Sequence, residues 1–206
     1  MLAATNHFGS GAIGIDLKSQ TSAAVSADPR KMGDLEGLTL RRPRAEDGPA
    51  VTELIRACPP LDANSAYCNL VQCLHFADTC VIAERAGVVV GWVSAHRPPG
   101  FPEQIFVWQV AVRACARGTG LASRMLDALI SRPAARDAKV LTTTITTSNA
   151  ASWALFGAFA RNRGLTLTKA PLFEREKHFR GAHETEWQAT IGPLTPSHTT
   201  FTKEDG

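Results

Sequence analysis

Apolar residues change their spacing several times along the chain, and each change predicts a different kind of element. Val51, Leu54, Ile55 and Cys58 recur every three or four positions, which is typical of a helix with one buried face. Residues 105–112 form a continuous run rich in β-branched and aromatic side chains, which is typical of a buried strand. By these criteria the predicted strands are residues 38–42, 80–84, 88–93, 105–112, 139–146, 165–169 and 184–191.

Capping and helix-breaking residues bound the predicted helices between these strands. Four helices are predicted, from Gly48 to the Pro59-Pro60 pair, from Asn64 or Ser65 to about Phe76, from Leu121 to about Arg132, and from Ser148 or Asn149 to about Arg163. The Ala86-Gly87 pair joins two strands as a hairpin. Helices and strands interleave, so the order predicts an α/β (α+β) fold with a mixed sheet covered on both faces.

The predicted elements lie within residues 37–194, which we expect to form one domain. Residues 1–36 are rich in Ala, Ser, Gly and Thr and lack a sustained apolar period or the hydrophobic stretch of a signal peptide. We therefore expect them to be a disordered tail, or one added for expression, and residues 195–206 to be a shorter C-terminal tail.

Composition excludes several classes of protein. Of the 206 residues, 44% are hydrophobic and 20% are charged, which is ordinary for a globular protein. The net charge of +3 comes without a basic stripe, which argues against nucleic acid as a partner, and no apolar run approaches the ~20 residues of a membrane span. The five cysteines are odd in number and lack CxxC spacing, so we expect reduced thiols in a cytoplasmic protein and no metal site.

The segment between the strand at 105–112 and the helix after it carries the clearest chemical signal. It consists of Arg117, Gly118, Thr119, Gly120, Leu121 and Ala122. Glycines let backbone N–H groups approach an anion, and a helix N-terminus adds partial positive charge, so the segment can cradle a pyrophosphate. A plain tight turn is the alternative. Neither the GxGxxG pattern of a Rossmann site nor the Gly-Lys-Ser/Thr ending of a P-loop is present.

Residues 117–122 match the Arg/Gln-x-x-Gly-x-Gly/Ala signature, and with the surrounding order of elements the chain resembles the GCN5-related N-acetyltransferases. Asn149 matches an asparagine of that family at the start of a helix. The resemblance implies a mixed, mostly antiparallel sheet flanked by helices, and acetyl-CoA as co-substrate. It also implies that the strand at 106–112 diverges from its neighbour, so that Val110, Ala111 and Val112 lie along the pantetheine arm. The composition of this strand, taken without the resemblance, fits an ordinary core strand equally well.

Rarer strings, at residues 59–67, 74–76, 106–112, 144–146, 149–156 and 178–186, resemble the L-2,4-diaminobutyrate acetyltransferases of ectoine synthesis. That resemblance implies transfer of acetyl to the γ-amine of L-2,4-diaminobutyrate by a homodimer. Two other functions stay open from the residues alone. One is acetylation of another small amine, and the other is a non-catalytic acyl-CoA-binding module.

Three residues in these strings are candidates for binding the acceptor amine. Asp62 can bind a substrate ammonium, although an aspartate after Pro-Pro-Leu also suits a turn. Tyr67, the single tyrosine, can contact the substrate or anchor its helix with a buried ring. Trp108 can form an aromatic wall or pack in the core. Strict alternation along its strand predicts that Trp108 shares a face with Phe106, Val110 and Val112.

Two residues near the C-terminus are candidates for proton transfer and substrate binding. Glu186 can accept the amine proton, and His183 can contact the substrate carboxylate or relay a proton. Both can line one pocket only if His183 lies in the loop before the strand. His178 and His183 are five residues apart without a third ligand, so we do not expect a metal there.

One position departs from the family pattern. Many acetyltransferases of this fold carry a tyrosine seven residues after the asparagine, as the acid for the leaving thiolate. This chain has Phe156 there, which cannot donate a proton.

Overall fold

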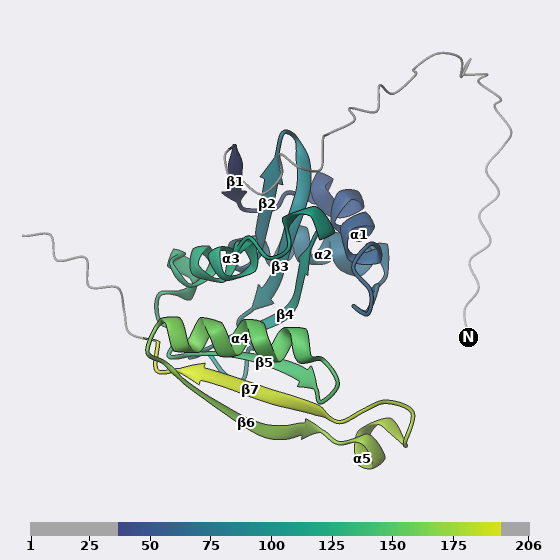
Figure 1. The fold of residues 1–206 in the computed structure, drawn as a ribbon, viewed down its shortest axis with the longest axis vertical. Coiled ribbons are helices and arrows are strands. Elements are labelled where there is room, and N and C mark those ends of the chain that lie inside the picture. The colour runs from purple at the N-terminus through teal and green to yellow at the C-terminus, as the bar shows by residue number, and fades with distance from the viewer. Residues whose placement is uncertain (1–36, 195–206) are drawn as a thin grey trace, which may run out of the picture.

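The computed structural model describes residues 37–194, which are built on a single seven-stranded sheet (Figure 1). The strands lie in the order β1-β2-β3-β4-β5-β7-β6, and the pairing is antiparallel everywhere except between β4 and β5. The strands are β1 (Leu38–Arg41), β2 (Val81–Arg85), β3 (Val88–His96), β4 (Gln104–Val112), β5 (Val140–Thr146), β6 (Thr166–Phe173) and β7 (Glu186–Gly192).

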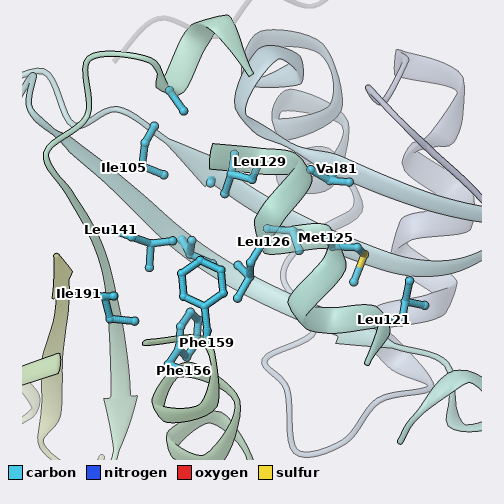
Figure 2. Packing of buried hydrophobic residues seen from close by; sticks show 14 of the residues in the cluster. Val81, Ile105, Leu121, Met125, Leu126, Leu129, Leu141, Phe156, Phe159 and Ile191 are labelled. Atoms are coloured by element: carbon cyan, nitrogen blue, oxygen red, sulfur yellow. The ribbon is translucent and has the colours of Figure 1, made fainter. Parts of the chain in front are cut away.

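Helices cover both faces of the sheet, as predicted. The helices are α1 (Gly48–Arg56), α2 (Ala66–His75), α3 (Leu121–Ile130), α4 (Ala150–Asn162) and the short α5 (Arg175–Phe179). Helices α1 and α2 pack on β2, β3 and β4 around Trp92 and Leu54. On the other face, Phe159 of α4 lies between Leu126 of α3 and Leu141 of β5 (Figure 2).

Local sequence accounts for most element boundaries. The Ser65 side chain accepts a hydrogen bond from the Cys68 N–H and caps α2, and Asn149 caps α4 in the same way. Ala86 and Gly87 both have positive φ, as a two-residue hairpin turn requires. Gly164, with φ of 64°, follows the end of α4.

The structure corrects the C-terminal part of the prediction. Strand β6 continues to Phe173, four residues beyond the predicted end, and α5 was not predicted at all. Helix α5 spans only five residues, too few for an apolar period to be visible in the sequence. The predicted tails at 1–36 and 195–206 lie outside the described residues.

Strand β4 has two irregularities that shape the site. It pairs with β5 only from Gln104 to Val107, so the two strands separate after Val107, as the family resemblance implied. Its pairing with β3 steps from Gln109 to Val107, which leaves Trp108 as the extra residue of a bulge. The separated strands open a space in the middle of the sheet.

Candidate active site

Two cavities meet where β4 and β5 separate. One, which we call the acceptor cavity, has a volume of about 550 Å³ and extends toward β7. The other, which we call the cofactor cavity, has a volume of about 440 Å³ and extends toward the start of α3. Five residues line both: Pro60, Leu61, Val110, Asn149 and Ser152. A group held in one cavity can therefore react with a group held in the other.

The cofactor cavity ends at the N-terminus of α3, where the sequence predicted a phosphate cradle. Gly118 and Gly120 have φ of 76° and 78°, in the left-handed region that favours glycine. Arg117 and Ala122 line the cavity beside them. The Thr119 hydroxyl is turned to the Ala116 carbonyl at 2.8 Å, so this residue shapes the turn. Backbone N–H groups and the helix dipole suit the diphosphate of coenzyme A.

Val110 and Val112 of β4 also line the cofactor cavity, whereas the Ala111 side chain is buried in the core under α1. The Val112 carbonyl already accepts hydrogen bonds from Arg117 Nε at 3.0 Å and from the Cys58 thiol at 3.3 Å. This carbonyl is therefore engaged by the protein. The backbone of Val110, beyond the end of the β4–β5 pairing, is better placed to meet a pantetheine arm.

Asn149 stands at the junction of the two cavities. Its Oδ1 accepts from the Ser152 N–H at 3.0 Å, which orders the first turn of α4. The cap thus places the Ser152 side chain at the same junction. The sequence singled out Asn149 but gave no sign of Ser152, which lies one turn further along the helix.

Three carboxylates and a histidine surround the acceptor cavity. Asp62 lines it from the α1–α2 connection, while Glu184 and Glu186 line it from β7 and the loop before. His183 lies in that loop, because β7 begins at Glu186, so both predicted residues line one cavity. This arrangement suits a substrate with more than one ammonium group.

Burial raises the pKa of Glu186, and the nearby Glu184 carboxylate adds to this effect. His183 and a hydrogen bond with Thr144 act in the opposite direction but are outweighed. A glutamate with a raised pKa is a better proton acceptor for an amine than an ordinary surface carboxylate.

Glu184 links the loop before β7 to the start of α4. Its carboxylate accepts from the Ser148 N–H at 3.3 Å and from the Ser148 hydroxyl at 3.1 Å. The Glu184 carbonyl lies 2.9 Å from His183 Nδ1, and a carbonyl can only accept, so Nδ1 carries the hydrogen. In the neutral ring Nε2 then remains an acceptor.

The bulge in β4 changes the predicted direction of several side chains. Trp108, Phe106 and His96 form a row of rings, with His96 5.4 Å from Phe106 and 6.3 Å from Trp108. Val110 and Val112 pack instead on the cluster under α3 and α4. The predicted shared face therefore holds for Trp108 and Phe106 but is wrong for Val110 and Val112, because the extra residue reverses the alternation. Trp108 is 46% exposed and lines the acceptor cavity, which rules out full burial in the core.

Tyr67 differs from both of its predicted roles. The side chain is 75% exposed on α2, so it is not a buried anchor for that helix. It also lines neither cavity of the described chain. Helix α2 directs Asn69 and Gln72 inward instead, which turns Tyr67 outward.

Phe156 is 2% exposed and forms part of the wall of the acceptor cavity. The ring fills the position at which the family pattern has a phenol, so α4 offers no acidic hydroxyl there. Other lining residues that the sequence did not single out are Gln109, Thr144, Ser148, Ser152 and Glu184. Glu184 was visible as an acidic neighbour of Glu186, whereas Gln109 depends on a bulge that has no sequence signature.

Within residues 37–194, no group of three His, Cys, Asp or Glu side chains is arranged to hold a metal ion. None of the helices in this range is long and apolar enough to cross a membrane.

Known proteins resemble this chain in sequence and in structure. A model of the acetyltransferase (GNAT) family matches residues 49–160. The L-2,4-diaminobutyric acid acetyltransferase of Methylotuvimicrobium alcaliphilum is 48% identical over 157 residues, which cover 76% of this chain and 91% of that protein. The enzyme of the same name from Vibrio cholerae is 48% identical over 158 residues, covering 77% and 91%.

A solved structure agrees with these relatives. The diaminobutyrate acetyltransferase EctA from Paenibacillus lautus, in complex with its substrate L-2,4-diaminobutyric acid and coenzyme A, superposes with a TM-score of 0.73. It is 41% identical, and the match covers 77% of this chain and 96% of that one. The chain therefore belongs to the acetyltransferase (GNAT) family and, within it, to the family of the diaminobutyrate acetyltransferases.

Proposed function

We propose that this protein transfers the acetyl group of acetyl-CoA to the γ-amine of L-2,4-diaminobutyrate. The observation that carries the proposal is the junction of the two cavities, one with a glycine-rich anion cradle and the other lined by carboxylates from the α1–α2 connection, from β7 and from the loop before β7. The similarity to an enzyme solved with both diaminobutyric acid and coenzyme A supports this choice of substrates. The name EctA of that relative supports a place in ectoine synthesis.

In this proposal, residues 117–122 hold the diphosphate through backbone N–H groups and direct the thioester toward the junction at Val110 and Asn149. Glu186 accepts a proton from the γ-ammonium, directly or through one water, which leaves a neutral amine. The amine nitrogen attacks the thioester carbonyl and gives up one further proton to water, the C–S bond breaks, and coenzyme A leaves as the thiolate. Phe156 supplies no proton to that thiolate.

Selectivity for the γ-amine has to come from geometry. The α-amine of the substrate has the lower pKa, so it is the more available nucleophile in solution. In our proposal Asp62 binds the α-ammonium, and His183 binds the carboxylate as an imidazolium that donates from Nε2. Trp108 packs against the aliphatic part with cation–π character. The γ-amine is then the group that reaches Glu186.

The test is thiol release from acetyl-CoA with L-2,4-diaminobutyrate, ornithine, lysine, spermidine or no amine, followed by NMR of the product. We expect the highest kcat/KM with diaminobutyrate and acetyl on the γ-nitrogen. Preference for another amine would be consistent with acetyl-CoA as co-substrate but would overturn the assignment of diaminobutyrate as the acceptor. Binding of acetyl-CoA without turnover of any amine would instead indicate a non-catalytic module.

The assembly we propose is a homodimer, working in the cytoplasm. Support comes from α2, which buries Asn69 and Gln72 while Tyr67, Leu70 and Leu74 are 38–75% exposed. An apolar outer face on a helix with a polar inner face is typical of an interface.

Light scattering of the full chain tests this assembly. We expect a dimer for the native protein and a monomer for the Leu70→Glu/Leu74→Glu variant. Val88→Glu, at an exposed apolar position on β3, is the matched control and should leave the dimer intact. A monomeric native protein would overturn the proposal.

A further inference from the structure

The bulge in β4 gives Gln109 a position that strict alternation would not. Because Trp108 is inserted opposite β3, Gln109 turns toward the α1–α2 connection rather than continuing the pattern of the strand. The Gln109 side chain is 7% exposed, although it borders the acceptor cavity. A buried amide needs hydrogen-bond partners, since an unsatisfied one costs free energy.

Both ends of this amide find partners in the same short segment. Gln109 Nε2 donates to the Asp62 carbonyl at 2.7 Å, and Gln109 Oε1 accepts from Asn64 Nδ2 at 3.2 Å. One side chain of the sheet therefore holds the segment at two residues, on either side of Ala63. Asp62 is the residue whose carboxylate belongs to the acceptor cavity.

Asn64 adds a conformational constraint to the same segment. Its φ is 50°, in the left-handed region that asparagine tolerates better than most residues. Its N–H donates to Asp62 Oδ1 at 3.4 Å. This hydrogen bond closes a turn in which the aspartate side chain folds back on the main chain. Backbone in an unusual conformation persists where neighbouring contacts hold it, and Gln109 supplies such a contact.

We propose that Gln109 is a positioning residue for substrate binding and that, together with Asn64, it fixes Asp62 at the wall of the acceptor cavity. The inference rests on the proposed function, because it assigns the acceptor amine to Asp62. Gln109 acts through the main chain of Asp62, whereas Trp108, its neighbour on the bulge, offers its own ring to the cavity. The bulge thus supplies both the aromatic wall and the support of the carboxylate.

The first variant is Gln109→Leu, which keeps the size and removes both hydrogen bonds. We expect KM for diaminobutyrate to rise about tenfold, equivalent to about 1.4 kcal/mol. The KM for acetyl-CoA should stay within about twofold, because Gln109 does not line the cofactor cavity. Gln72→Leu is the matched control. Gln72 is also a buried glutamine, but it lies in α2 and lines neither cavity, so the variant should leave both KM values unchanged.

Asn64 allows the hydrogen bond to be separated from the backbone conformation. Asn64→Gly keeps the left-handed φ accessible and removes only the side-chain bond, whereas Asn64→Ala also disfavours the conformation. We expect the KM for diaminobutyrate to rise more in Asn64→Ala than in Asn64→Gly. Equal KM values in these two variants would show that the conformation of Asn64 plays no part.

A double-mutant cycle with Asp62→Ala tests whether Gln109 acts through Asp62. If it does, adding Gln109→Leu to Asp62→Ala should change the KM for diaminobutyrate by less than about twofold. A further tenfold rise would overturn the proposal, and so would an equal loss with both substrates in Gln109→Leu alone. Failure of the native protein to acetylate diaminobutyrate would instead count against the proposed function, which the same assays measure first.

Discussion

Glu186 shows how a single side chain acquires its chemistry from its surroundings. The sequence places it near the start of a strand, where a glutamate is ordinarily solvated. In the structure it borders the acceptor cavity beside Glu184, and both burial and the like charge raise its pKa. A raised pKa stabilises the protonated form relative to that of a solvated glutamate, so the carboxylate becomes available as base only at higher pH than usual.

This gives a prediction for the pH dependence of catalysis. As base, Glu186 must be ionised, so kcat/KM for diaminobutyrate should rise as pH climbs through its raised pKa, above the usual value of about 4.3. Glu186→Gln should lower kcat by about 10²-fold or more and abolish the acid limb of the pH profile, which is the rise of kcat/KM with pH. Glu184→Gln should move the limb to lower pH, because a like charge is removed. A Glu186→Gln variant with the native profile would exclude Glu186 as the base.

The cysteines differ sharply in their predicted reactivity. Burial raises the pKa of Cys73 and of Cys80 to about 12 each, so neither forms thiolate near neutral pH. Cys115, before the glycine-rich turn, is exposed. With iodoacetamide at pH 8, mass spectrometry should find Cys115 alkylated first, while Cys73 and Cys80 react only in denaturant. Cys115→Ser should remove the fast phase of alkylation. Alkylation of Cys73 or Cys80 in the native protein would contradict the predicted order of reactivity.

At the scale of elements, local patterns were sufficient for most of the fold. Leu121, Met125, Leu126 and Leu129 recur at helical spacing within the helix predicted from Leu121 to about Arg132, and all four are buried in α3. Capping residues located the starts of α2 and α4 to within a residue or two. Local patterns did not predict the bulge in β4 or the separation of β4 from β5. Nothing in the spacing of residues 105–112 marks them, because they depend on which strands become neighbours.

The turn before α3 gives a prediction at this scale. Gly120 has φ of 78°, and although a Cβ there would meet no atom within 4 Å, an L side chain in this conformation costs about 1–2 kcal/mol. Gly120→Ala should therefore raise the KM for acetyl-CoA and lower the melting temperature, with little change in the KM for diaminobutyrate. Gly100→Ala is the control, since Gly100 lacks positive φ and is equally unhindered. An unchanged KM for acetyl-CoA in Gly120→Ala would argue against the anion cradle.

At the scale of the whole molecule, an ion-pair cluster ties the first strand to the rest of the sheet. Arg41 of β1 donates to both carboxylate oxygens of Asp47 at 2.7 Å and to Glu84 of β2 at 2.7 Å. The Arg41 guanidinium, together with the Arg44 N–H, lowers the pKa of Asp47. β1 is a short edge strand, so side-chain contacts of this kind carry much of its attachment.

Stability should therefore depend on pH through Asp47. Its pKa is lower in the folded than in the unfolded protein, so its contribution is present above the unfolded value of about 4 and is lost as pH falls through the folded value. Asp47→Asn should lower the free energy of unfolding by about 2 kcal/mol at pH 7, and the difference should shrink in acid.

Urea titrations at several pH values measure this dependence. Glu103→Gln breaks an exposed pair with Lys139 and is the control, with an expected loss under about 1 kcal/mol. A loss in Asp47→Asn that stays constant with pH would show that the charge of Asp47 is not the cause.

The sequence by itself determined the glycine-rich turn and the order of the elements other than α5, and most of the site residues that it suggested line the two cavities. These features follow from local periodicity, backbone preferences and family motifs. Tertiary structure alone decided where the side chains point. It reversed the alternation after Trp108, turned Tyr67 outward and brought Gln109 to Asp62, 47 residues earlier in the chain. Contacts of that separation depend on strand register and on the packing of distant helices, and no short stretch of sequence encodes either.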